Sequence, residues 1–203
     1  AIEDERFYEH NGIDLKGIAR ALVADLKSMD FTQGASTITQ QLVKNNVLSE
    51  QWESENTGDI SKIEKMERQV QRKIQEMYIA VELEKKVDDK DWILENYLNS
   101  INLGNNTLGV QAAAERYFGK DVSDLTLSEC AVIAGITKNP SGYNPILYPE
   151  QNAKRRKMVL DAMLKQGYIT QKQYDEAMVD DVYDRISEHN SGFETSIDRK
   201  SVV

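Results

Sequence analysis

The chain has few of the residues that form crosslinks and tight turns. Its 203 residues include one cysteine, and the counts of Gly 11 and Pro 3 are low. One cysteine cannot form a disulfide within the chain, and an all-β protein would need more turn residues. The cysteine, Cys130, lies in the apolar stretch ECAVIAG, so we expect a small buried side chain rather than a nucleophile.

Long apolar runs and excess positive charge are also missing. No run of about 18 apolar residues occurs, so the sequence contains no segment that would span a bilayer, and it contains no signal peptide. The 25 Lys and Arg residues against 34 Asp and Glu give a net charge of −9, which argues against a nucleic-acid partner. With 40% hydrophobic residues the chain can still bury a core.

The motifs of nucleotide, metal and serine chemistry do not occur. There is no P-loop, no GxGxxG and no GxSxG, and His10 and His189 lack the spacing of a metal-binding pair. Each histidine is expected to be structural. What the chain has left for catalysis is carboxylates and cations.

Apolar residues recur at helical spacing through most of the chain, which predicts an all-α fold. Helices are expected over residues 14–28, 36–45, 67–86, 90–101, 109–120, 125–135 and 150–169, with a short last helix after Thr170. Three of these starts have the spacing of a capping box, at Thr37 and Gln40, Thr126 and Glu129, and Thr170 and Gln173. The acidic stretch from about residue 45 to 66 predicts a mobile loop, with Gly58 near its middle.

The helix predicted at 67–86 contains the first unusual feature. Its apolar residues fall on two sides, which predicts a central helix: Val70, Ile74, Met77 and Val81 on one, Ile79 and Leu83 on the other. Glu76 lies between apolar neighbours, so we expect it to be buried or to line a cleft. The alternative is a solvated ladder of ion pairs, which is common on helices.

Cations gather near this glutamate although the chain is acidic. Arg68, Arg72 and Glu76 are spaced i, i+4 and i+8, with Lys73 three residues before Glu76. Gln40 and Lys44 share a face of another predicted helix. Such a cationic group suggests a specific anion, phosphate being the usual one. Carboxylates beside a phosphate site suit sugar transfer with a diphosphate leaving group.

The sequence resembles a known family in five ordered segments. These are EDERFYEHNG, GASTITQQLVKN, RKIQE, WILENYLNSINLG and AAAERYFGK. They are similar to the signature segments of the peptidoglycan glycosyltransferases, the transglycosylase domain of class A penicillin-binding proteins. The likeness covers about residues 1–180.

The resemblance implies a lysozyme-like, all-α lobe with a smaller jaw that touches the membrane. It implies an enzyme that polymerises lipid II into glycan strands by inverting transfer and releases undecaprenyl diphosphate. Glu3 would be the base that activates the acceptor 4-hydroxyl, and Glu76 would lie near the donor and leaving group. The positions that match the diphosphate and sugar site are Ser36, Gln40, Gln41, Lys44, Arg68, Arg72 and Lys73. Asp4 would lie near a loosely bound Mg²⁺ or other divalent cation.

The same resemblance implies partners and a location. The partners would be lipid II, the growing glycan, the membrane surface, the cell-wall synthesis machinery and moenomycin-type inhibitors. The location would be the extracytoplasmic face of the bacterial plasma membrane. Glu3 stands so close to Ala1 that we interpret Ala1 as a cut, with an anchor upstream. The domain is expected over residues 1–181, with a linker at 182–203, and no transpeptidase motif is present.

Two features depart from the family pattern. Gln75 stands where some members have lysine, and the stretch between Lys44 and Arg68 is longer than in many. The alternatives are a lysozyme-like hydrolase or lytic transglycosylase, whose neutral leaving group needs no cations, and a non-catalytic helical module that binds partners. A shared groove for the Glu3 and Glu76 carboxylates would distinguish the enzyme from the module.

Overall fold

The computed structural model describes residues 1–28, 35–48 and 61–190, and the side chains of these ranges except those of 22–28 and 62. Within these ranges the chain is helical and has no strand, apart from one isolated antiparallel bridge between Asn102 and Leu108. This confirms the prediction of an all-α fold. The chain divides into two compact units, one of residues 3–100 and one of residues 1–2 with 101–203.

No helix within the described ranges has the length and apolar character needed to cross a membrane. Three predicted features lie wholly or mostly outside these ranges: the loop before Ala35, the middle of the predicted mobile loop at 49–60, and the end of the predicted linker at 191–203.

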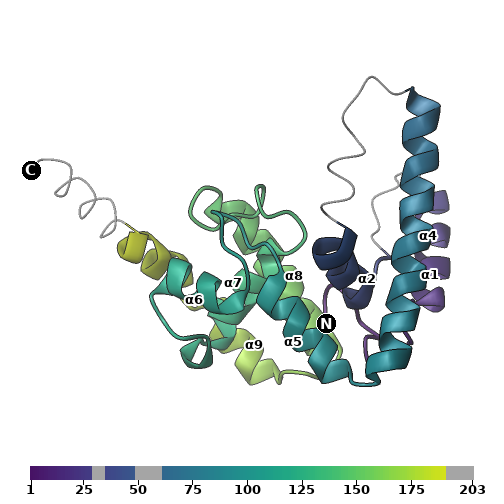
Figure 1. Cartoon of the computed structure of the whole chain (residues 1–203). Coiled ribbons are helices and arrows are strands. Elements are labelled where there is room, and N and C mark those ends of the chain that lie inside the picture. The colour runs from purple at the N-terminus through teal and green to yellow at the C-terminus, as the bar shows by residue number, and fades with distance from the viewer. Residues whose placement is uncertain (29–34, 49–60, 191–203) are drawn as a thin grey trace, which may run out of the picture. The chain divides into compact units, whose positions relative to one another are not determined.

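The unit of residues 3–100 is built from four α-helices and one π-helical segment in its described part (Figure 1). They are α1 (Leu15–Ser28), α2 (Ile38–Val43), η1 (Lys44–Leu48), α4 (Lys62–Val87) and α5 (Lys90–Ser100). The short α2 packs against both α4 and α5. Its last residue, Val43, forms a small apolar cluster with Leu48 and Ala80.

Capping side chains decide where two of these helices begin. Thr37 caps α2 and forms the predicted box with Gln40. Ser61 caps α4 in the same way, with Glu64 as its partner. The prediction of a loop from about 45 to 66 is therefore wrong at both ends, because residues 44–48 are π-helical and α4 starts at Lys62. The capping box of Ser61 and Glu64 lies inside an acidic stretch whose composition favours a loop.

The long helix α4 buries one face, and that face is largely polar. Glu76, Ala80 and Glu84, spaced four residues apart, are exposed by only 4%, 0% and 6%. The prediction that Glu76 is buried is confirmed, whereas the prediction of two buried apolar faces is wrong. Val70 and Ile74 remain 54% and 60% exposed, because the side of α4 that faces α2 is the one with the two glutamates.

A glycine lets the loop after the first motif approach α4 closely. Gly12 has φ +85°, and a Cβ there would lie 2.7 Å from the backbone carbonyl of Ala80. The Thr37 hydroxyl donates a hydrogen bond to the Gly12 carbonyl at 2.7 Å. The N-terminal loop is thus fixed between the start of α2 and the middle of α4.

The second unit is a helical bundle that begins after a loop at residues 101–109. Its elements are α6 (Val110–Phe118), the 3₁₀ turn η2 (Val122–Asp124), α7 (Leu127–Ile136), α8 (Pro149–Lys165) and α9 (Gln171–Met178). Helices α7, α8 and α9 pack on one another around a core of Ala131, Val159, Leu160, Ile169 and Ala177. The predicted capping boxes at Thr126 and Thr170 are both present.

Two predictions for this unit need correction. Cys130 is exposed rather than buried, because it lies on the outer side of α7. The packed structure also continues past residue 181, since residues 182–190 are helical and Val182 and Ile186 are 0% and 2% exposed. A linker would therefore begin no earlier than residue 191.

Candidate active site

Two neighbouring carboxylates in the N-terminal loop have different surroundings. The Asp4 side chain is only 2% exposed. Its Oδ2 accepts a hydrogen bond from the Ile38 backbone N–H at 3.0 Å, in the first turn of α2, and lies 2.9 Å from Nε2 of His10. Asp4 therefore holds the loop against the start of α2, whereas Glu3 stays half-exposed.

The surroundings of Asp4 do not fit a resident Mg²⁺. Its two carboxylate oxygens lie 3.1 and 2.9 Å from His10 Nε2, and one of them also accepts the Ile38 N–H. Mg²⁺ needs accessible oxygen ligands and usually keeps several waters. In the part of the chain that the structure describes, no group of three or more His, Cys, Asp or Glu side chains could hold a metal ion. The predicted metal role of Asp4 thus has no support in this geometry, and we derive no catalytic step from it.

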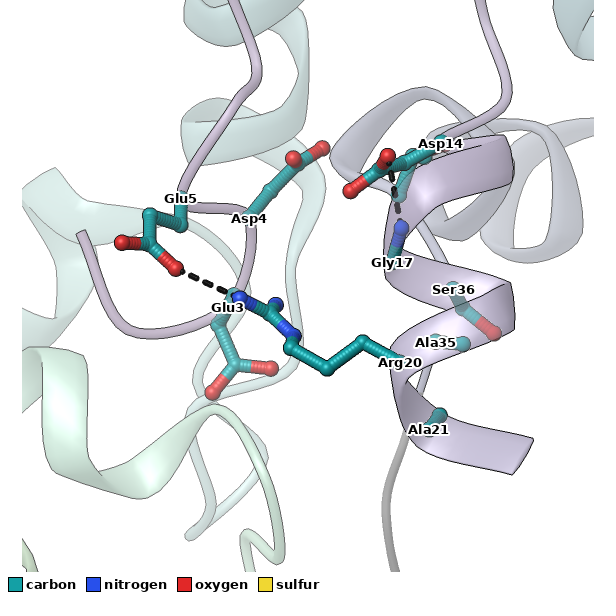
Figure 2. Close-up of a pocket in the computed structure, with 10 residues that line it drawn as sticks. Glu3, Asp4, Glu5, Asp14, Gly17, Arg20, Ala21, Ala35 and Ser36 are labelled. Atoms are coloured by element: carbon teal, nitrogen blue, oxygen red, sulfur yellow. Dashed lines mark hydrogen bonds and ion pairs between the residues drawn. The ribbon is translucent and has the colours of Figure 1, made fainter. Parts of the chain in front are cut away.

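Glu3 lies beside a small cavity within the 3–100 unit (Figure 2). The cavity is about 40 Å³ in volume and is also lined by Asp4, Ser36 and Thr37. Arg20 reaches across from α1 and its Nη1 lies 2.9 Å from Oε2 of Glu5, the pair joined by a dashed line in Figure 2. The structure thus brings Glu3 together with Ser36, another residue singled out from the sequence.

Ser36 connects this cavity to the buried glutamate of α4. Its hydroxyl accepts a hydrogen bond from Nζ of Lys73 at 2.6 Å, and the same ammonium lies 3.1 Å from Oε2 of Glu76. Arg72 Nε approaches the other oxygen of Glu76 at 3.6 Å. Glu76 does not line the cavity beside Glu3. The shared groove for the two glutamates therefore stays a prediction, with Ser36 and Lys73 as the connection between them.

The two glutamines of the second motif have different environments. Gln40 is 1% exposed, and its Oε1 accepts the Thr37 backbone N–H as the capping side chain. Gln41 is half-buried, and its Oε1 accepts a hydrogen bond from the Tyr97 hydroxyl at 3.1 Å. Burial raises the pKa of Tyr97, and the negative charges of Glu3 and Asp4 raise it further. Gln41 is therefore fixed by a neutral tyrosine that lies within the electric field of Glu3.

The remaining predicted cations occupy more open positions. Lys44 is exposed at the junction of α2 and η1, and Arg68 is half-exposed eight residues before Glu76 on α4. Both belong to the same compact unit as Glu3 and Glu76. The side chains of Lys44 and Arg68 are therefore accessible to an anionic ligand, whereas the buried Oε1 of Gln40 caps α2.

Sequence reasoning missed a second buried glutamate in this unit. Glu84 accepts a hydrogen bond from the Thr39 hydroxyl, and its Oε2 accepts one from Nζ of Lys90 at 2.6 Å. Glu84 lies eight residues after Glu76 and therefore on the same face of the helix, and this spacing was the signal available in the sequence. Buried carboxylates are rare unless they are paired.

Comparison with known proteins then identifies the family. A family model described as Transglycosylase matches residues 1–164. The chain belongs to the transglycosylase family. This agrees with the resemblance found in the five sequence segments, which include Glu3, Ser36 and Glu76.

Named relatives give the same assignment. The chain is 48% identical over 176 residues to penicillin-binding protein 1A of Escherichia coli strain K12, an alignment that covers 87% of this chain and 19% of that protein. It is 47% identical over 182 residues to penicillin-binding protein 1A of Vibrio cholerae, with 90% and 20% covered. Penicillin-binding protein 1F of Bacillus subtilis is 44% identical over 173 residues, with 85% and 22% covered.

A solved structure is also similar. The 2.6 Å crystal structure of penicillin-binding protein 1A from Haemophilus influenzae shares 48% sequence identity, with a TM-score of 0.44 over 45% of this chain and 14% of that one. The chain spans about a fifth of the length of the curated relatives named above.

Proposed function

We propose that the chain is a peptidoglycan glycosyltransferase that polymerises lipid II into glycan strands. The observation that carries the proposal is the arrangement of Glu3 beside Ser36, with Ser36 joined through Lys73 to the buried Glu76. Membership of the transglycosylase family supports the reaction class. The acceptor, the donor and the leaving group are part of the proposal.

In this reaction Glu3 acts as the general base. Its carboxylate takes the proton from the acceptor 4-hydroxyl, and the freed oxygen attacks the anomeric carbon of the donor with inversion. The bond from that carbon to the diphosphate breaks, and its electron pair leaves with undecaprenyl diphosphate. A half-exposed carboxylate beside a cavity is suited to this role, because it can reach a bound hydroxyl and return its proton to solvent.

The cations stabilise the negative charge on the departing diphosphate. Lys44, Arg68, Arg72 and Lys73 are the candidates, and charge-assisted hydrogen bonds to phosphate are the strong ones. Glu76 holds two of them, Arg72 and Lys73, in place by its ion pairs. Ser36 and Gln41 would contact the sugar or the diphosphate, and Gln40 contributes indirectly by capping α2.

The proposed setting is the extracytoplasmic face of the plasma membrane, where a lipid-linked substrate is found. An apolar row on α4 supports contact with the membrane surface. Its members are all more than half exposed: Ile63, Met66, Val70, Ile74 and Tyr78. Moenomycin-type inhibitors and the cell-wall synthesis machinery are the further proposed partners.

The test is polymerisation of labelled lipid II in detergent by the chain and its variants. Glu3→Gln should lower turnover by about 10²–10⁴-fold, the usual contribution of a general base, and should leave binding of a moenomycin-type inhibitor nearly unchanged. Lys44→Ala should weaken inhibitor binding by about ten- to a hundredfold, since a hydrogen bond to a charged group contributes about 1.5–3 kcal/mol. Glu9→Gln, an exposed carboxylate on the same loop, is the matched control.

The outcomes separate the rival readings. Full turnover by Glu3→Gln would remove Glu3 from the mechanism. Release of short sugars from a finished glycan, without polymerisation of lipid II, would indicate a hydrolase or lytic transglycosylase instead.

A further inference from the structure

A second polar cluster contacts the loop that carries Glu3. The carboxylate of Glu84 accepts hydrogen bonds from Thr39 on α2 and from Lys90, the first residue of α5. The side chain of Glu84 is 4% exposed and that of Lys90 is 21% exposed. The Lys90 ammonium also lies 4.6 Å from the centre of the Phe7 ring. None of these residues belongs to the proposed substrate site.

This cluster contacts the N-terminal loop at Phe7, three residues after Asp4. Asp4 binds the backbone of Ile38, which is the residue before Thr39. Phe7, four residues after Glu3, is 4% exposed and lies beneath the Lys90 cation. The loop is therefore fixed to α2 at Asp4 and to the start of α5 at Phe7, and Glu84 joins α2 to α5.

The chemistry of the cluster explains why all its members are needed. The Lys90 ammonium lies over an aromatic ring, and such cation–π contacts are stronger when the cation is desolvated. Glu84 keeps that ammonium in place, and the Thr39 hydroxyl satisfies the second oxygen of the buried carboxylate. If Glu84 lost its charge, the long lysine side chain would turn toward water and the ring of Phe7 would lose its cover.

We propose that Glu84 and Lys90 are positioning residues for Glu3, acting through Thr39 and Phe7. The proposal rests on the proposed role of Glu3 as the base. The cluster sets where the loop lies relative to α2, which begins two residues after Ser36 and carries Gln41. A base displaced by about 1 Å from its productive position can cost up to about 10²-fold in rate.

The principal experiment compares Lys90→Met with Lys90→Arg in lipid II polymerisation. Lys90→Met should lower kcat about tenfold or more with KM changed less than about twofold, because the substrate contacts remain and only the alignment of the base is lost. Lys90→Arg keeps the cation over the ring and should recover most of that loss. Lys85→Met is the matched control, since Lys85 lies five residues before Lys90 in the last turn of α4, is 63% exposed and pairs with Glu82. A rise in KM at unchanged kcat would overturn the proposal.

A milder variant guards against misfolding. Thr39→Val removes one hydroxyl from a side chain that is fully buried and keeps its shape. It should lower kcat in the same direction, by about threefold to tenfold, without a change in circular dichroism. Wild-type kcat in Thr39→Val together with wild-type kcat in Lys90→Met would refute the positioning role.

Two further readouts separate this proposal from the role of Glu3 itself. In a Glu3→Gln background, measured with enzyme in excess of substrate, Lys90→Met should cause no further loss, because the group it positions is gone. An equal loss in both backgrounds would overturn the proposal. Amide hydrogen exchange of residues 3–10 should also become about tenfold faster in Lys90→Met and not in Lys85→Met. Full turnover by Glu3→Gln would remove Glu3 from the mechanism and with it the rate effect expected here. Unchanged exchange in Lys90→Met, with Glu3→Gln still impaired, would end the present inference alone.

Discussion

Replacing Asp4 by asparagine tests whether this carboxylate is a structural clamp or a metal ligand. The amide has nearly the same shape as the carboxylate, so the change removes one charge and one acceptor oxygen and leaves packing almost intact. The group it alters is 2% exposed and bonded to His10 and to the first turn of α2. The structure therefore predicts a loss of stability that does not depend on Mg²⁺.

The size of the loss follows from the contacts of Asp4. A hydrogen bond to a charged group contributes about 1.5–3 kcal/mol, and a negative charge at a helix N-terminus adds about 0.3–1 kcal/mol. The amide can still accept the Ile38 N–H with its oxygen, but its nitrogen then faces Nε2 of His10. His10 would have to move its proton to Nδ1, a buried atom with no hydrogen-bond partner among the described residues. We expect Asp4→Asn to lower the free energy of unfolding by about 2–4 kcal/mol.

Tryptophan fluorescence during urea unfolding reports on the unit of residues 3–100, which contains Asp4. Both tryptophans, Trp52 and Trp92, lie between residues 3 and 100, and the other unit has none. The measurement is made with Mg²⁺ and with a chelator, and Glu9→Gln serves as the exposed control, with an expected change within about 0.5 kcal/mol. A loss under about 1 kcal/mol, or one that appears only when Mg²⁺ is present, would refute the clamp.

Three other predictions concern the unit that contains α6 to α9. Gly119→Ala should destabilise it by about 2–3 kcal/mol, because the added Cβ would combine a φ of +65° with a 2.7 Å approach to His189. Gly167→Ala should cost only about 1 kcal/mol, because its φ is +76° but no atom of the described residues lies within 4 Å of the added Cβ. Equal losses in urea denaturation would contradict this. Ile186→Ala should cost about 2–4 kcal/mol if residues 182–190 belong to the fold, and a loss below 0.5 kcal/mol would restore the linker boundary at 182. Burial raises the pKa of Glu129, but the hydrogen bonds from Lys120 and from the Thr126 N–H lower it, and the net pKa is below the usual 4.5. The ionised Glu129 therefore stabilises the fold fully above about pH 4.5, and this stabilisation is lost as the pH falls through the lower pKa of the folded state. The stability gap between the wild type and Glu129→Gln should therefore shrink on acidification below about pH 4.5, and a constant gap would show the ion pairs to be unimportant.

The helix starts were the most predictable part of the fold. A capping box is a local signal, and the boxes at Thr37, Thr126 and Thr170 are all present. The box at Ser61 obeys the same rule but lies in an acidic stretch, so composition outweighed it. Exposure was harder to predict: Cys130 and Val70 occupy apolar sequence, yet both are exposed. Local pattern shows which residues share a face, whereas the neighbouring helix decides which face is buried.

The candidate site shows the same division between local and distant information. The burial of Glu76 was predictable from its apolar neighbours, and its pairs with Arg72 and Lys73 follow from helical spacing. The contact from Lys73 to Ser36 joins residues 37 positions apart and needed the structure. The burial of Glu84 was missed for that reason, because its partners Thr39 and Lys90 lie on two other helices.

Asp4 and Glu3 are adjacent in sequence, and their different surroundings explain how a carboxylate near the start of the chain could be held for catalysis. Asp4 uses its charge on His10 and on the start of α2, so the backbone at residue 4 is fixed. The Glu3 carboxylate stays half-exposed beside the cavity with Ser36. A base must be both well placed and accessible, and one side chain seldom achieves both, since the contacts that place it also cover it. Dividing the two requirements between neighbours resolves that conflict, and it explains why loss of the Asp4 charge should impair the chain although the oxygens of Asp4 are bonded to His10 and to the Ile38 N–H.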